Sequence, residues 1–201
     1  MRSHLYRSSP PRRRIGGAVA VLAAVAVFAG GGVAHAQSGS NVARGKLATS
    51  LSLPCTLQSG PDNAVDGDSS PPNIYTDKWC ARPLLVGPHV LTVDLGSGYD
   101  LNAFTVRHAG FAGESSLFNT RAYSIKTSRD GLVWSTAVTV AANTANVTTH
   151  VLPSLALGVR QVRLVITQAE QRPGVNVARI YEFEAWGSYR LSSDCLLGIC
   201  L

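Results

Sequence analysis

The sequence lacks the short motifs that mark the common catalytic centres. Its 201 residues contain no G-x-S-x-G nucleophile turn, no H-E-x-x-H zinc motif and no glycine-rich phosphate loop. Beyond the first 36 residues it has only three histidines, His89, His108 and His150. Asp94 and Glu114 are a formal pair of carboxylates for glycoside hydrolysis, but Asp94 falls within an alternating strand pattern. The sequence therefore favours a binding protein over an enzyme.

The chain also lacks a long helical pattern. Nowhere after Gln37 do apolar residues recur at i, i+3, i+4 and i+7 for long enough to form a major helix. Several short segments instead place apolar side chains at every second position, as in half-buried strands. They are residues 91–95, 104–106, 123–125, 138–140, 162–166 and 181–185. This spacing predicts an all-β protein, an antiparallel β-sandwich or jelly roll, in which residues 41–90 form irregular loops.

Acidic residues are absent from the first 36 positions, which carry five arginines. An uncharged stretch follows over residues 15–33, and Ala34, His35 and Ala36 form a small-residue cleavage site. The pattern predicts a signal peptide over residues 1–36, cleaved before Gln37, and an extracellular protein; a retained membrane anchor is the alternative. Without those arginines, the 18 basic and 12 acidic residues of the chain reduce to a formal charge of +1. This balance argues against nucleic acid or a membrane as the partner.

Cysteine is scarce, and all four cysteines follow residue 36. An even number in an exported chain favours disulfides over a metal site. Three pairings are possible, and we favour Cys55–Cys80, which braces a loop-rich region, with Cys195–Cys200, which closes a small loop in the tail. A zinc site is the alternative, but no C-x2-C pair or histidine at ligand spacing accompanies these cysteines.

A series of motifs resembles the pattern of discoidin-like domains. Residues 41–49 read N-V-A-R-G-K-L-A-T and resemble the family's opening, N-L-A-x-G-K-P-A-T. Further motifs follow in the family's order: N-A-V-D-G-D at 63–68, K-W at 78–79, V-D-L-G at 93–96, S-R-D-G at 128–131 and I-Y-E-F-E-A-W-G at 180–187. The resemblance implies one galactose-binding-like domain over residues 37–187, followed by a short tail, 188–201, with two cysteines.

The family includes coagulation-factor type C domains, which bind phospholipid, and family 32 carbohydrate-binding modules, which bind galactose-type and related sugars. Fold alone does not decide between such ligands. The stretch 106–121 looks most like the sugar-binding modules, so the resemblance implies a non-catalytic, lectin-like module that binds glycans. An adhesion or protein-interaction module, or one that binds phospholipid, is the alternative.

The resemblance also implies a structural calcium ion. Asp66 and Glu182 would supply carboxylates, and the remaining expected ligands are Asn63, Asp68, Thr76 and Tyr181, through backbone carbonyls and the Thr76 hydroxyl. Calcium takes six to eight oxygen ligands, which suits this set. An insertion around residues 71–75 distinguishes the chain from the family before Thr76. The alternative is an Asx-turn at Asp66, with Glu182 paired to a surface cation.

The loop between residues 108 and 121 carries the predicted ligand site. Its polar candidates are His108, Glu114, Asn119 and Arg121, and its aromatic candidates are Phe111 and Phe118. A pyranose offers an apolar C–H face that packs on an aromatic ring and hydroxyls that need charged or amide partners. The same residues also have structural interpretations: His108 as a core histidine, Arg121 as a partner of acidic neighbours, and Phe118 as a plug of the sandwich end.

The three tryptophans are expected to be structural. Trp134 follows a turn into a strand and Trp186 ends the last strand pattern, and both places favour packing of large rings into a core. Trp79 adjoins Cys80 and is a candidate to pack on the disulfide, with ligand contact as the alternative.

Overall fold

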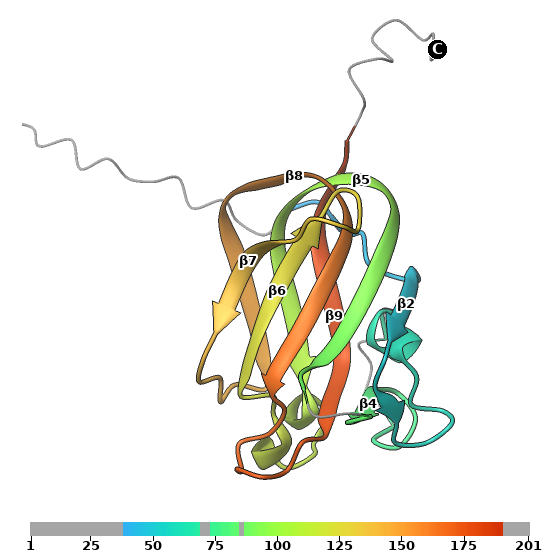
Figure 1. Cartoon of the computed structure of the whole chain (residues 1–201), viewed down its shortest axis with the longest axis vertical. Helices are drawn as coiled ribbons and strands as arrows, with labels where there is room; N and C mark the ends of the chain where they lie inside the picture. Colours follow the sequence, from blue (N-terminus) through green and yellow to red (C-terminus); the bar gives the residue numbers. More distant parts are fainter. Residues whose placement is uncertain (1–37, 69–72, 85–86, 191–201) are drawn as a thin grey trace, which may run out of the picture. The chain divides into compact units, whose positions relative to one another are not determined.

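The computed structural model describes residues 38–68, 73–84 and 87–190, and most of them form strands (Figure 1). The predicted signal peptide and the predicted Cys195–Cys200 bond lie outside the described residues. The strands are β1 (Ser40–Asn41), β2 (Leu47–Ser50), β3 (Leu53–Pro54), β4 (Trp79–Arg82), β5 (His89–His108), β6 (Ala122–Ser128), β7 (Ser135–Val140), β8 (Val147–Gln168) and β9 (Ala178–Tyr189). Three 3-10 helices are η1 (Pro61–Ala64), η2 (Ala109–Ala112) and η3 (Ser116–Phe118). None of the described helices is long and apolar enough to cross a membrane.

The strands pair antiparallel in the order β3-β4-β9-β5-β8-β6-β7, with β1 on β9 and β2 on β5. β5 and β8 are long strands that belong to two layers. In the first layer, residues 99–108 of β5 lie between β9 and residues 147–156 of β8. In the second layer, residues 89–94 of β5 pair with β2 and with residues 161–166 of β8, and β6 and β7 follow. The predicted antiparallel β-sandwich is confirmed.

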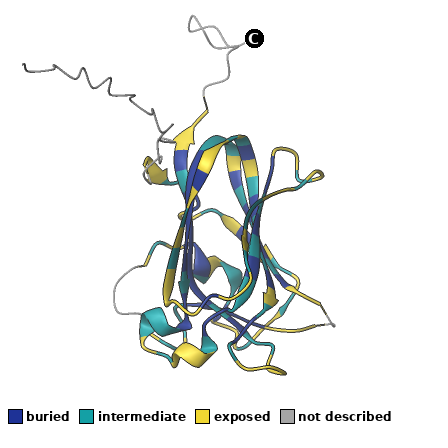
Figure 2. Cartoon of the chain, turned by 90° about the vertical axis from the view of Figure 1, so that its left-hand side faces the viewer, coloured by how far each residue is buried: buried dark blue, intermediate teal, exposed yellow. Residues whose placement is uncertain are grey.

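The core lies between these layers and is built from the alternation seen in the sequence. In the second layer, Leu91 of β5 faces Leu164 of β8 in register, and both are 0% exposed. In the first layer, the rings of Phe104 and Phe183 stack at 6.1 Å between centroids. Figure 2 shows buried residues alternating with exposed ones along the strands. Burial of such apolar side chains is the main force that stabilises the sandwich.

The tryptophan predictions need a correction. Trp79 is the tryptophan in the core, at 1% exposure, whereas Trp134 and Trp186 are only half-buried. The ring of Trp134 lies 3.9 Å from the guanidinium carbon of Arg163. The Nε1 atom of Trp186 donates a hydrogen bond to Glu184 at 2.9 Å. Each indole thus contacts a polar side chain on an outer face of the sandwich. The apolar core offers no such partner.

The region expected to be irregular contains short strands. β2 pairs with β5 from Leu47↔Asp94 to Ser50↔Leu91, and β4 pairs with β9 from Trp79↔Ile180. These pairings hold the N-terminal loops against β5 and β9. The connections 109–121, between β5 and β6, and 169–177, between β8 and β9, meet at one end of the sandwich, where Gln171 donates its backbone N–H to Leu117 at 3.0 Å (Figure 1). We call these two connections the paired loops.

Candidate functional site

Two of the predicted ligand residues, His108 and Asn119, are buried near the two ends of the 109–121 connection. Asn119 is 0% exposed: its Oδ1 accepts from the Gly110 N–H at 2.7 Å, and its Nδ2 donates to Asn146 at 2.8 Å. His108 is also 0% exposed, and its Nε2 lies 3.2 Å from the Thr148 hydroxyl. In this structure neither side chain can touch a ligand that comes from solvent. The Asn119 side chain instead fixes the backbone of the 109–121 connection, and the His108 ring joins the end of β5 to the start of β8.

The two phenylalanines are half-buried and lie beside guanidinium groups. The ring centroid of Phe111 is 4.7 Å from the Arg107 guanidinium carbon. The ring centroid of Phe118 is 4.4 Å from the guanidinium carbon of Arg179 and 5.5 Å from the guanidinium carbon of Arg172. Such contacts are attractive because the ring face carries partial negative charge. Leu117, next to Phe118, is 46% exposed and adds apolar surface there.

Glu114 lies in a cluster of charges. Its Oε1 is 2.6 Å from Lys78 Nζ and accepts a hydrogen bond from the Tyr181 hydroxyl at 2.6 Å, and its Oε2 is 3.6 Å from Arg179 Nε. Arg179 also pairs with Glu170, which is 0% exposed. Burial and the Glu114 carboxylate raise the pKa of Tyr181, so its hydroxyl stays protonated and donates. We call Lys78, Glu114, Glu170, Arg179 and Tyr181 the ionic cluster.

Arg121 keeps more of its surface exposed than His108 or Asn119. It is half-buried, and its Nη1 donates to the Gln171 side chain at 3.2 Å. It forms no ion pair with any residue in the described part of the chain. The expected bridge from Arg121 to an acidic neighbour is thus not seen within these ranges, whereas Arg107 does pair with Glu184 at 3.1 Å.

The predicted calcium residues bring two carboxylates together. Glu182 is 1% exposed, and its oxygens accept from the Gly67 N–H at 3.2 and 3.3 Å. Burial, followed by the negative charge of Asp66, raises the pKa of Glu182 to about 8. The Asp66 Oδ1 accepts from the Asp68 N–H at 2.9 Å, so the Asx-turn is present. A buried carboxylate beside a second one is the kind of donor set that fits a hard cation.

The other predicted ligands are arranged less directly around these carboxylates. The Asn63 amide donates to the backbone carbonyls of Thr76 and Lys78, and the Thr76 hydroxyl donates to Asp77 at 2.6 Å. The Tyr181 side chain points into the ionic cluster. Within the described ranges, no three His, Cys, Asp or Glu side chains gather as a metal-binding group. A cation here would therefore take most of its ligands from backbone and hydroxyl oxygens.

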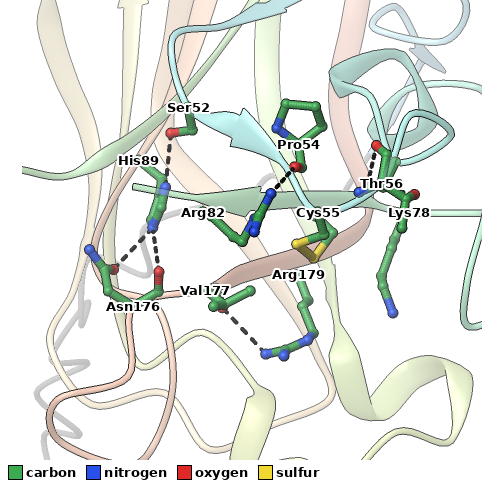
Figure 3. The surroundings of a disulfide bond; sticks show 12 residues. Ser52, Pro54, Cys55, Thr56, Lys78, Arg82, His89, Asn176, Val177 and Arg179 are labelled. Atoms are coloured by element: carbon green, nitrogen blue, oxygen red, sulfur yellow. Dashed lines mark hydrogen bonds between the residues drawn. A yellow bond between two sulfur atoms is a disulfide. The ribbon is translucent and has the colours of Figure 1, made fainter. Parts of the chain in front are cut away.

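The Cys55–Cys80 disulfide is present as predicted (Figure 3). It joins the end of β3 to β4, where the Cys55 N–H also donates to the Cys80 carbonyl at 3.0 Å. Arg82 Nη2 donates to the Pro54 carbonyl at 3.3 Å, across the same strand pair. The bond therefore fastens the loop region to β9 through the pairing of β4.

The structure also holds an open cavity of about 500 Å³ that the sequence did not indicate. Residues from the end of β6, the β6–β7 turn, β7 and β8 line it: 127–130, 133, 135–137, 152–157 and 159. It opens between β7, which pairs only with β6 among the described strands, and residues 152–157 of β8. The cavity shares no residue with the paired loops, so this hollow and the predicted ligand residues are separate.

Comparisons with known proteins agree on the fold. A family 32 carbohydrate-binding module from EndoD of Streptococcus pneumoniae superposes with a TM-score of 0.61 and 22% identity, over 74% of this chain and 100% of that one. A family 32 module from NanJ of Clostridium perfringens, solved with galactose, gives 0.58 and 18%, over 74% and 98%. A fucose-binding module of Streptococcus pneumoniae gives 0.57 and 17%, over 75% and 99%.

No curated protein matches the chain in sequence. The model of the F5/8 type C domain matches residues 48–183, which is more than half of the chain and includes the discoidin-like motifs at 63–68 and 93–96. The antiparallel sandwich, the order of the motifs and this match agree, and the chain belongs to the F5/8 type C, or discoidin, domain family.

Proposed function

We propose that the chain is a secreted, non-catalytic carbohydrate-binding module whose ligand lies against the paired loops. One observation carries the proposal: Phe118, Leu117 and Arg121 come together there on a backbone that Asn119 fixes. A sugar ring packs its C–H face on apolar surface and needs donors for its hydroxyls, and this arrangement offers both. The similar folds of modules solved with sugars also support a carbohydrate ligand.

A glycan array with the mature chain tests the proposal, followed by calorimetry on the glycans that bind. We expect dissociation constants between about 1 mM and 1 μM, because shallow loop sites bury little surface. Arg121→Ala should abolish binding and Phe118→Ala should weaken it, both without unfolding. Leu132→Ala, a change at an exposed residue of the β6–β7 turn, is the control that should bind as the parent does. The proposal fails if no glycan binds, or if the folded Arg121→Ala variant retains full affinity.

A specific observation favours protein interaction as a second candidate. Leu57 is 100% exposed and Leu51 is 87% exposed, both in the segment around the disulfide, and Leu84 is 58% exposed. Exposed apolar groups that gather on one surface often mark a binding face. If the array is negative, a Leu51→Ser, Leu57→Ser variant that loses cell-surface adhesion would support this candidate.

We also propose that Asp66 and Glu182 bind a structural calcium ion that stiffens the loops. An ion that binds only the folded state stabilises it by mass action, by about 2.7 kcal/mol at a hundredfold excess over its dissociation constant. Calcium should therefore raise the melting temperature relative to chelator, and Glu182→Gln should remove the increment. Asp62→Asn, which removes an exposed carboxylate from the same loop region, is the matched control and should keep it. Identical melting curves for the parent in both conditions would exclude the ion.

Secretion can be tested on the exported protein. N-terminal sequencing should start at Gln37, as the Ala34-His35-Ala36 site predicts. A secreted product that still carries Ile15 would contradict the signal peptide.

A further inference from the structure

The carboxylates beside the paired loops are buried, whereas the cations at their surface are not neutralised. The side chains of Glu114 and Glu170 are only 12% and 0% exposed, and they pair with Lys78 and Arg179. Arg172 is exposed and Arg121 is half-buried, and neither forms an ion pair with any described residue. An approaching ligand therefore meets guanidinium groups rather than carboxylates.

Gln171 links these two arginines. Its side chain accepts from Arg121 Nη1 at 3.2 Å and donates to the carbonyls of Asn119 and Asn143, each at 2.9 Å. Its backbone N–H donates to the Leu117 carbonyl at 3.0 Å. Because Gln171 directly precedes Arg172, these bonds fix the backbone from which Arg172 projects.

Arg172 and Arg121 are thus tied to the same residue, Gln171, one through the chain and the other through a hydrogen bond. The Arg172 guanidinium carbon is 5.5 Å from the Phe118 ring centroid, and Leu117, whose carbonyl accepts from the Gln171 N–H, directly precedes Phe118. A planar guanidinium can donate two parallel hydrogen bonds to a carboxylate or a sulfate, and such charge-assisted bonds are stronger than those to a neutral hydroxyl.

We propose that the ligand of this site is an anionic glycan, whose carboxylate or sulfate is held by Arg172 and Arg121 while its ring lies on Phe118 and Leu117. This inference rests on the proposed function and names its ligand class. Uronic acids and sulfated sugars share the required chemistry. Arg172 then determines specificity, although it lies outside the loop in which the sequence placed the ligand.

Calorimetry with matched pairs of oligosaccharides tests the inference. One pair is an oligogalacturonate and its methyl ester, and the other is a sulfated galactan oligosaccharide and its desulfated form; both are measured without added calcium, because oligogalacturonate binds that ion itself. We expect the anionic member of at least one pair to bind roughly tenfold or more tightly, with a preference that declines as salt is raised. The pair that shows the preference distinguishes a uronate from a sulfate.

Variants assign the preference to Arg172. Arg172→Ala should remove most of it, Arg172→Lys should retain part of it, and both should still bind the neutral member. Arg129→Ala is the control for net charge: Arg129 is exposed, lines the separate cavity, and donates to the Leu157 carbonyl at 2.9 Å. That variant should keep the full preference.

Three outcomes would overturn the inference. Equal affinity for the charged and neutral members of both pairs would refute the anionic ligand while leaving a sugar-binding module in place. An Arg172→Ala variant that behaves like Arg129→Ala would remove the assigned role of Arg172. Absence of binding to all four oligosaccharides would refute the inference, and a negative glycan array in addition would refute the proposed function.

Discussion

His108 is the last residue of β5, and the environment of its side chain favours the neutral imidazole. It is 0% exposed, and its Nδ1 atom has no hydrogen-bond partner among the described residues. The Thr148 hydroxyl lies 3.2 Å from its Nε2 and 2.7 Å from the hydroxyl of Tyr123, which in turn lies 2.8 Å from His150 Nε2. Burial, with a smaller effect of His150, lowers the pKa of His108 to about 4. A proton on this ring therefore opposes folding.

We expect the free energy of unfolding to decrease as the pH falls from about 6.5 towards 4. The unfolded chain takes up a proton near pH 6.5, whereas the folded state resists it down to about 4, so the unfolded state binds more protons within this window. The loss attributable to His108 is at most roughly 3 kcal/mol, at about 1.4 kcal/mol per pKa unit. Urea unfolding at several pH values should show a shallower dependence for His108→Gln.

His89 and His150 keep part of the slope in that variant, because burial lowers their pKa values too. If the parent and His108→Gln lose stability in parallel between pH 6.5 and 4, His108 is not a source of the pH dependence.

Among the elements, the short strands β3 and β4 depend on a covalent bond. β3 has two residues and β4 has four, so their pairing alone contributes few backbone hydrogen bonds. The Cys55–Cys80 bond joins positions 25 residues apart. Cross-linking a loop of that length reduces the entropy of the unfolded chain. The disulfide therefore sets how firmly the N-terminal loops remain on β9.

We expect the double variant Cys55→Ser, Cys80→Ser to unfold with a free energy lower by on the order of 3 kcal/mol. Denaturant unfolding measures the change, and the parent protein after reduction should match the variant. Hydrogen exchange should increase first in residues 53–82 rather than in β6 or β8. Unchanged stability after reduction would mean that β3 and β4 hold the loops without the bond.

The strands and the contacts between loops differ in how far the sequence could predict them. Alternation at period two predicted the long strands, because each has one buried face, as in Leu91 and Leu164. The ionic cluster escaped prediction because Lys78, Glu114 and Arg179 come from three separate segments. From the sequence alone, Glu114 is expected to be an exposed carboxylate in a loop. Its burial is favourable only because Lys78 and Arg179 pair with it in the folded chain. Arg172 was missed for the same reason, since its loop contacts 109–121 only in the folded chain.

For the whole molecule, the decisive feature is that β5 and β8 run through both layers. Residues 99–108 of β5 belong to the first layer and residues 89–94 to the second, and β8 divides in the same way. Neither layer can lose β5 or β8 without disrupting the other. The two layers also share one core, with Phe183 on one side and Leu164 on the other.

This arrangement predicts that the sandwich unfolds as one cooperative unit. Phe183→Ala, in the first layer, should lower the free energy of unfolding by about 3–5 kcal/mol, and Leu164→Ala, in the second, by about 2–5 kcal/mol, because both side chains are 0% exposed. In each variant, circular dichroism and tryptophan fluorescence should report the same transition, since Trp134 and Trp186 lie on different layers. Separate midpoints, or faster exchange of β9 amides in Phe183→Ala with β6 still protected, would show that the layers unfold independently despite their shared strands.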